Sequence, residues 1–116
     1  MKYLLLIYRN EAEAAAEGEG AGAKMMKAYG DFTQSIIKGG QFKGGDALQS
    51  VTTATTVRVR SGKTMTTDGP FAETREQLGG FYLIEAKDLD EAIQIAARVP
   101  SAKYGSIEIR PIRVFE

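Results

Sequence analysis

The amino-acid sequence predicts an α+β fold whose elements follow the order β-α-β-β-α-β. Two runs, residues 2–9 and 79–86, are apolar at both alternating positions, which is typical of central strands covered on both faces. Residues 23–38 and 89–99 instead carry apolar side chains at helical spacing. A chain of 116 residues can bury one core without disulfides or a structural metal, so we expect one domain over residues 1–116.

The first strand has apolar side chains on both faces: Tyr3, Leu5 and Ile7 on one, and Leu4, Leu6 and Tyr8 on the other. This run is shorter than the hydrophobic region of a signal peptide and stops at Arg9, which favours a buried strand. A chain this short has enough helix for only one face of a sheet. We therefore expect the second face to pack against another copy, as a homodimer.

A long helix is expected after a variable segment. Residues 10–22 are acidic, rich in alanine and interrupted by glycines, but they lack the full G-x-G-x-x-G pattern, which favours a mobile loop or a frayed helix. The helix over residues 23–38 then ends at Gly39-Gly40. Its predicted buried stripe consists of Met25, Tyr29, Phe32 and Ile36.

In the middle of the chain, the sequence predicts an irregular strand over residues 41–50, followed by a short hairpin. In residues 54–60, Val57 and Val59 alternate with Arg58 and Arg60, which predicts one buried face and one solvated face. The turn at residues 61–63 leads into a short strand over residues 64–67. This hairpin is an addition to the β-α-β-β-α-β order.

In the last third of the chain, the sequence predicts a central strand, a helix and a final strand. Asp88 is the expected N-cap of the second helix, with Glu91 completing a capping box, and Pro100 closes it. In the final strand, residues 106–115, the apolar parity shifts across Pro111, which predicts a bulge or an edge position. The predicted buried stripe of the helix consists of Leu89, Ala92, Ile93, Ala96 and Val99.

This order is the ferredoxin-like, split β-α-β arrangement: an α+β sandwich with an added short hairpin strand. Both helices are expected on one face of the sheet. The other face is left for a partner.

Composition excludes several classes of function. The chain has 15 basic and 15 acidic residues, so it has no bulk attraction to nucleic acid or an anionic membrane. It contains no cysteine and no histidine, which removes thiol nucleophiles, imidazole bases and metal sites built from these residues. No run approaches the length of a membrane-spanning helix. We expect a cytoplasmic protein without metal or cofactor that binds neither nucleic acid nor membrane.

The most distinctive stretch is Asp68-Gly69-Pro70-Phe71, followed by the run over residues 76–82, Glu-Gln-Leu-Gly-Gly-Phe-Tyr. Together with residues 3–8, 54–60 and 107–111, it resembles the DGPF family within the YCII-related group. The resemblance implies a small ferredoxin-like protein, usually dimeric, with a dimeric α/β barrel-like association and mostly unassigned function. Some DGPF relatives are encoded beside extracytoplasmic-type sigma factors, which implies a regulatory protein partner as one alternative.

Asp68 has two interpretations. Its side chain can accept backbone hydrogen bonds in an Asx-turn, while Gly69 and Pro70 set the backbone of the turn; from sequence this is the favoured interpretation. Alternatively, a carboxylate on a rigid turn beside the apolar Phe71 can serve as a general acid or base.

Tyr29 is the second candidate. In YCII-type relatives a histidine on the first helix pairs with an aspartate in a proposed catalytic dyad, and the resemblance places Tyr29 where that histidine stands. A Tyr29–Asp68 pair, with the phenol as donor and the carboxylate as acceptor, is one hypothesis. The favoured interpretation of Tyr29 is a core residue whose hydroxyl lies at the rim.

Three further residues are candidate ligand contacts. Arg9 and Arg75 offer cations for a small anion, although each is more often a solvated surface charge. Gly79, at the entrance of a strand, indicates a bulge or a close backbone approach. Carboxylates at 68, 73 and 76 match no known cation-binding loop, so we expect no metal site there.

The leading hypothesis is a dimeric small-molecule-binding protein. Its pocket is expected between the sheet, the first helix and the Asp-Gly-Pro-Phe turn, with Gly69, Pro70 and Phe71 among the ligand contacts. The alternatives are a small enzyme that uses Asp68 as general acid or base, and a regulatory protein that acts with a sigma factor.

Overall fold

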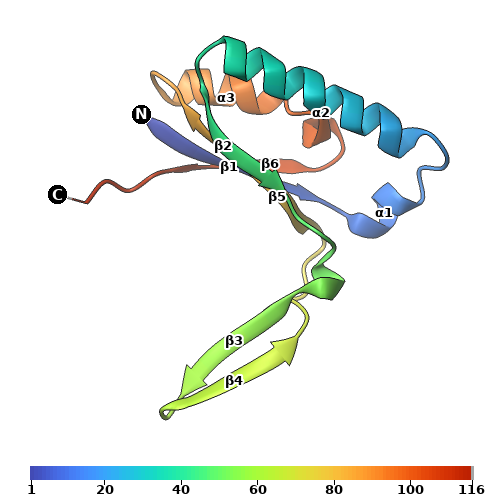
Figure 1. Cartoon of the computed structure of the whole chain (residues 1–116), viewed down its shortest axis with the longest axis vertical. Coiled ribbons are helices and arrows are strands. Elements are labelled where there is room, and N and C mark those ends of the chain that lie inside the picture. Colours follow the sequence, from blue (N-terminus) through green and yellow to red (C-terminus); the bar gives the residue numbers. More distant parts are fainter. Residues whose placement is uncertain (116) are drawn as a thin grey trace.

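A four-stranded antiparallel sheet with helices on one side forms the body of the computed structural model, which describes residues 1–115 (Figure 1). The strand order is β2-β5-β1-β6. The central strands are β1 (Lys2–Arg9) and β5 (Gln77–Glu85), and the edge strands are β2 (Phe42–Ala47) and β6 (Ser106–Pro111). The two doubly apolar runs are therefore central, as predicted, and β6 lies at an edge.

Burial alternates along the central strands. Tyr3, Leu5 and Ile7 are buried, whereas Leu4, Leu6 and Tyr8 between them are only partly covered. The buried set faces α2 (Ala21–Lys38) and α3 (Leu89–Ala97), which lie on the same side of the sheet in Figure 1. The core thus sits between helices and sheet, and the opposite face carries the partly covered side chains. We call that face the open face.

The helices follow the predicted stripes with two differences. In α2, Phe32 and Ile36 are buried as expected. In the second stripe Ala92, Ala96 and Val99 are buried as predicted, but Ile95 is 2% exposed whereas the predicted core residue Ile93 is 49% exposed. Leu89, also predicted to be buried, is 51% exposed. Asp88 caps α3 as predicted, its carboxylate accepting a hydrogen bond of 2.9 Å from the Glu91 amide.

The segment over residues 10–22 forms more structure than expected. A short helix, α1 (Glu11–Ala15), follows β1, and the Asn10 side chain caps it by accepting a hydrogen bond of 2.8 Å from the Glu13 amide. Two single turns of 3-10 helix complete the elements: η1 (Val51–Thr53) before the hairpin and η2 (Pro100–Lys103) after α3.

The hairpin forms, but outside the main sheet. Strands β3 (Thr55–Arg60) and β4 (Lys63–Asp68) pair only with each other and project away from the body (Figure 1). The expectation of a buried valine face within one chain is wrong, because Val57 and Val59 are each 59% exposed. The prediction of strand structure through residue 115 is also wrong, because β6 ends at Pro111.

Candidate functional site

A pocket of about 450 Å³ lies between α2 and the helix-facing side of the sheet. Its walls come from the ends of β1 and β5, from β2, from one side of α2 and from η2. Apolar walls with a few convergent polar groups are typical of small-molecule sites. The side chains that carry the following description are Ile7, Arg9, Tyr29, Thr33, Phe42, Tyr82 and Ser101.

Two pairs of hydroxyl groups line the pocket. The Tyr29 hydroxyl donates a hydrogen bond of 2.7 Å to the Ser101 Oγ, and Thr33 Oγ1 lies 2.7 Å from the Tyr82 hydroxyl. Each pair ties α2 to an element on the other side of the pocket. Burial raises the pKa of Tyr29 above its ordinary value, an effect that its hydrogen bonds to Ser101 oppose. Tyr29 therefore remains a neutral phenol that can donate a hydrogen bond.

Arg9 is the one cationic side chain among the described residues that line this pocket. It stands at the end of β1, and its side chain is 17% exposed. The guanidinium forms an ion pair with Glu17 and lies over the Tyr104 ring, 4.7 Å from the ring centroid. These two contacts fix the group at the pocket wall, where an anionic ligand group would compete with Glu17 for it.

Glycines bring the backbone close to the pocket. The β1–β5 register shifts where Ile7 pairs with Gly80 and Tyr8 with Leu78, so Gly79 is the extra residue of a β-bulge, as predicted. At Gly80, an added Cβ would lie 3.0 Å from the Asp46 carbonyl oxygen of the neighbouring strand. This part of the wall is therefore main chain, because side chains have no room there.

The Asp-Gly-Pro-Phe turn lies at the end of β4, outside this pocket. Asp68 is exposed, and among residues 1–115 its carboxylate accepts no hydrogen bond. Gly69 makes the turn instead: its φ is +99°, its amide donates to the Ala54 carbonyl at 2.7 Å, and its own carbonyl accepts from Thr56 Oγ1 at 2.8 Å. The turn is held by backbone contacts and a threonine rather than by an Asx-turn at Asp68.

The structure thus divides the predicted site residues into two groups. Arg9, Tyr29 and Gly79 come together at the pocket. Asp68 at the end of β4 lies outside it, as do four residues of the connection from β4 to β5: Gly69, Pro70, Phe71 and Arg75. Phe71 is 77% exposed, and the Arg75 carbonyl is held by the Asn10 side-chain amide at 2.8 Å. Within one chain, Tyr29 therefore bonds to Ser101 and not to Asp68.

Sequence reasoning missed most of the pocket lining, including the side chains of Thr33, Phe42, Tyr82 and Ser101. Thr33 follows Tyr29 by four positions, so both face the same side of α2, and this spacing was an available signal. Phe42, Tyr82 and Ser101 carried no signal that separates them from ordinary core or loop residues. Residues 1–115 contain no group of three His, Cys, Asp or Glu side chains arranged to hold a metal ion. No helix over these residues is long and apolar enough to span a membrane.

Similar proteins support this description of the fold. An uncharacterised protein of Rhizobium meliloti (strain 1021) is 35% identical over 118 residues, covering 100% of this chain and 95% of the relative. In structure, the chain is similar to 5-chloro-2-hydroxyhydroquinone dehydrochlorinase from Burkholderia phenoliruptrix AC1100, solved in complex with 2,5-dihydroxybenzoquinone, with a TM-score of 0.57. That match covers 97% of this chain and 94% of the other at 12% identity, which shows likeness of fold alone. The model of the YCII-related domain matches residues 1–116, and the chain therefore belongs to the YCII-related family.

Proposed function

We propose that the protein binds a small, largely apolar molecule bearing oxygen groups in the pocket between α2 and the sheet. The observation that carries the proposal is the pairing of apolar walls with two hydroxyl pairs and one fixed guanidinium. Hydroxyls that already bond to each other are satisfied without ligand, and each can turn toward a carbonyl or hydroxyl that enters the pocket.

The ligand class follows from the same groups. The neutral Tyr29 phenol donates to an oxygen acceptor, and Arg9 favours a carboxylate or another acidic oxygen. A ring carrying hydroxyl, carbonyl or carboxylate groups fits this combination. The structural neighbour in complex with a dihydroxybenzoquinone offers a precedent for such a ligand on the same fold.

We further propose that the working form is a homodimer with a dimeric α/β barrel-like association through the open face. Leu4, Leu6 and Tyr8 on β1 share this face with Phe81 and Leu83 on β5, and all five are only partly covered. Within residues 1–115 the helices pack on the opposite side (Figure 1). Covering these side chains with a second sheet removes apolar area from water at about 25 cal/mol per Å².

A bulky side chain introduced at an exposed position of the pocket lining tests whether the pocket binds the ligand. Ala47 is exposed and lines the pocket, whereas Leu48, the next residue, does not line it. We expect a hydroxylated aromatic acid or quinone that raises the melting temperature of the wild type to raise that of Leu48→Phe equally, and to have little effect on Ala47→Phe. At a hundred times the Kd, binding stabilises the folded state by about 2.7 kcal/mol. Equal stabilisation of all three proteins would place the ligand elsewhere.

Asp68→Asn belongs in the same experiment because the Asp-Gly-Pro-Phe turn stays a proposed part of the site. If the variant keeps its unliganded melting temperature and loses the ligand-induced rise, the turn contributes to binding. If it binds as the wild type does, the site consists of the pocket residues alone.

A further inference from the structure

The hairpin of β3 and β4, residues 55–68, which we call the arm, is almost entirely uncovered. Eleven of its twelve strand residues are exposed, and only Thr56 is partly covered. Its two strands form a sheet of their own, joined to no strand of the body. An isolated two-stranded hairpin is at best marginally stable in water. An arm of this kind is therefore expected to gain its stability from a contact outside the chain.

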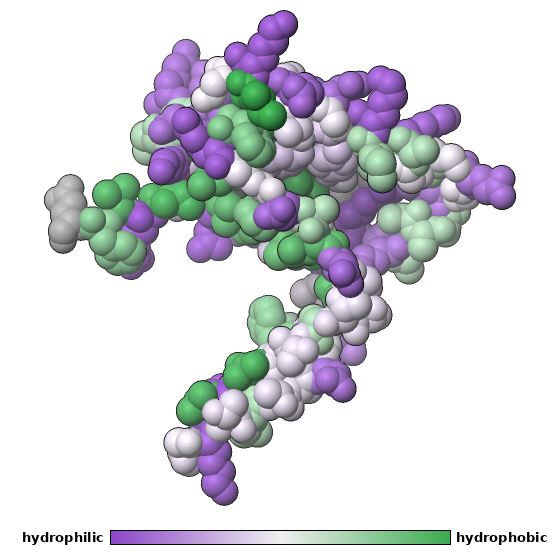
Figure 2. Space-filling view, viewed as in Figure 1, coloured by the Kyte–Doolittle hydropathy of each residue, from purple (hydrophilic) through white to green (hydrophobic). Residues whose placement is uncertain are grey.

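The two faces of the arm differ in chemistry. The register pairs Val57 with Thr66 and Val59 with Thr64, so these four β-branched residues share one face, which we call the valine face. The other face pairs Arg58 with Met65 and Arg60 with Lys63 and is basic. Figure 2 shows apolar and near-neutral surface along the arm and hydrophilic surface at its tip. One-sided chemistry of this kind is typical of a strand pair with one face packed and one in solvent.

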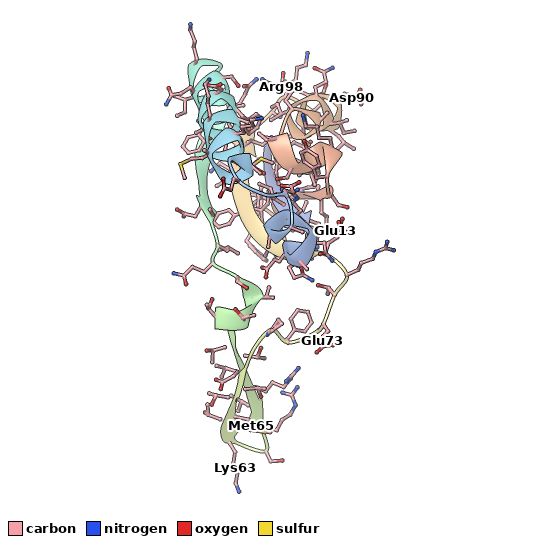
Figure 3. All side chains as sticks on the ribbon, turned by 90° about the vertical axis from the view of Figure 1, so that its right-hand side faces the viewer. Glu13, Lys63, Met65, Glu73, Asp90 and Arg98 are labelled. Atoms are coloured by element: carbon pink, nitrogen blue, oxygen red, sulfur yellow. The ribbon has the colours of Figure 1, made fainter. Side chains whose placement is uncertain are left out.

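The base of the arm is fixed to the body on both sides. Before β3, the Glu11 carboxylate accepts hydrogen bonds from the Ser50 hydroxyl at 2.7 Å and from the Val51 amide at 3.1 Å. After β4, the loop that carries Glu73 in Figure 3 is held through the Asn10 bond to the Arg75 carbonyl, at 2.8 Å. The segments before β3 and after β4 are thus both anchored at the start of α1. These anchors set the direction of the arm in the free chain, which lowers the entropy cost of ordering the arm when it binds a partner.

We propose that the arm packs its valine face against a second copy of this chain, in addition to the contact between open faces. A second copy is favoured because one molecule presents both uncovered apolar surfaces, the valine face and the open face. In a two-fold dimer each arm reaches the other protomer, so every such surface is covered on both copies.

Charge also favours a second copy. The arm carries three cations and one carboxylate, so the rest of this neutral chain has an acidic excess of two. Asp46 on β2 belongs to this excess and is an exposed residue of the four-stranded sheet, whereas the exposed Glu108 on β6 is already paired with Arg110 at 3.1 Å. A basic arm that reaches the body of another protomer meets charge of the opposite sign, which steers association and fixes its register.

In such a dimer, Asp68 has a neighbouring surface that it lacks within one chain. Asp68 pairs with Thr55 at the base of the arm, two positions along from Thr66, and therefore lies on the valine face. In the assembly its carboxylate faces the other protomer. The Asp-Gly-Pro-Phe turn of one chain then lies beside the body of the second.

The test compares two aspartates on opposite faces of the arm. Val57 and Met65 are 59% and 52% exposed in one chain, so neither Val57→Asp nor Met65→Asp removes a core contact. By sedimentation velocity over a range of concentrations, we expect Val57→Asp to weaken the dimer at least tenfold, with an unchanged far-UV spectrum. Met65→Asp is expected to associate as the wild type does. A dimer that Val57→Asp leaves intact, or one that Met65→Asp disrupts instead, would overturn the proposal.

A second measurement uses the absence of cysteine from the chain. A single cysteine in Val57→Cys should be alkylated slowly in the dimer, and one in Met65→Cys at the rate of an exposed thiol. Equal rates at both positions would also refute the packed valine face.

Separate experiments test the arm contact and the proposed function. Leu6→Asp tests the contact between open faces. If this variant dissociates the dimer while Val57→Asp does not, the contact between open faces is supported and the arm contact is wrong. Ligand binding reports on the pocket independently of both. A wild type that is monomeric at every concentration removes the dimer and the arm contact together, while leaving the pocket test unaffected.

Discussion

Removing the Tyr29 hydroxyl tests the hydrogen bond that joins α2 to η2 across the pocket. In Tyr29→Phe the ring stays in place, but the buried Ser101, which is 5% exposed, loses the partner of its side chain. Leaving a buried polar group unsatisfied costs about 1–3 kcal/mol. In Ser101→Ala the phenol loses its acceptor, but Tyr29 is only partly buried whereas Ser101 is buried, so water can replace the serine as its partner. We expect this variant to lose only about 0.5–1.5 kcal/mol.

The difference is measurable by urea denaturation at a fixed protomer concentration, since dimerisation would otherwise shift the midpoint. With an unfolding entropy of about 2.1 cal/mol/K per residue, 116 residues give roughly 0.24 kcal/mol/K, so a loss of 2 kcal/mol lowers the melting temperature by about 8 °C. A Tyr29→Phe variant as stable as the wild type, or a larger loss in Ser101→Ala, would refute this account of the pair.

The pH dependence of stability gives an independent check on the same residue. Burial raises the pKa of Tyr29 in the folded state above the ordinary value of 10.0. The resulting contribution to stability is complete below that ordinary value and is lost as the pH rises through the folded-state pKa. Wild-type stability should therefore fall more steeply than that of Tyr29→Phe at alkaline pH. Parallel slopes for the two proteins would mean that the phenol titrates as it does in water.

Two further predictions concern the scaffold around the site. An added Cβ at Gly45 would lie 2.6 Å from the Phe81 carbonyl oxygen, whereas an added Cβ at Gly44 meets nothing within 4 Å. Gly45→Ala should therefore lower the melting temperature by several degrees, and Gly44→Ala should not. Equal effects in calorimetry would show that β2 can shift away from β5. Asp88→Ala removes the N-cap of α3 and should cost about 1 kcal/mol, while Asp90→Ala, two residues further on in the first turn, should cost less. The free energy of unfolding from urea titration measures both, and a larger loss in Asp90→Ala would contradict the capping role.

Most of the fold could be predicted from the sequence because each helix and strand has its own apolar pattern or capping residue. The doubly apolar runs became β1 and β5, Asp88 became the N-cap of α3, and the glycine pair at the entrance of β5 produced a bulge. The errors came where the signal was ambiguous. In α3, both Ile93 and Ile95 are apolar and within one turn; the pattern favoured Ile93, but packing in the structure buries Ile95.

The site was harder to predict because it depends on which distant elements meet. Tyr29 and Ser101 are separated by 72 positions, and Thr33 and Tyr82 by 49, so no local pattern joins them. The alternation of Val57 and Val59 correctly predicted a strand, but alternation cannot tell whether the covering surface belongs to the same chain. Asp68 stood out in sequence because its turn is unusual, and the structure places that turn away from the pocket.

The sheet topology also constrains how the chain folds during synthesis. β1 pairs with β5 and β6, so Tyr3 meets Ile84 on one side and Pro111 on the other. During synthesis β1 therefore has no partner strand until β5 has been made and no second partner until β6 follows, while the arm closes locally within microseconds. During this wait a strand that is apolar on both faces is open to pairing with other chains. Conditions that slow synthesis of the later strands should thus favour aggregation through β1, although β1 is a central strand of the folded sheet.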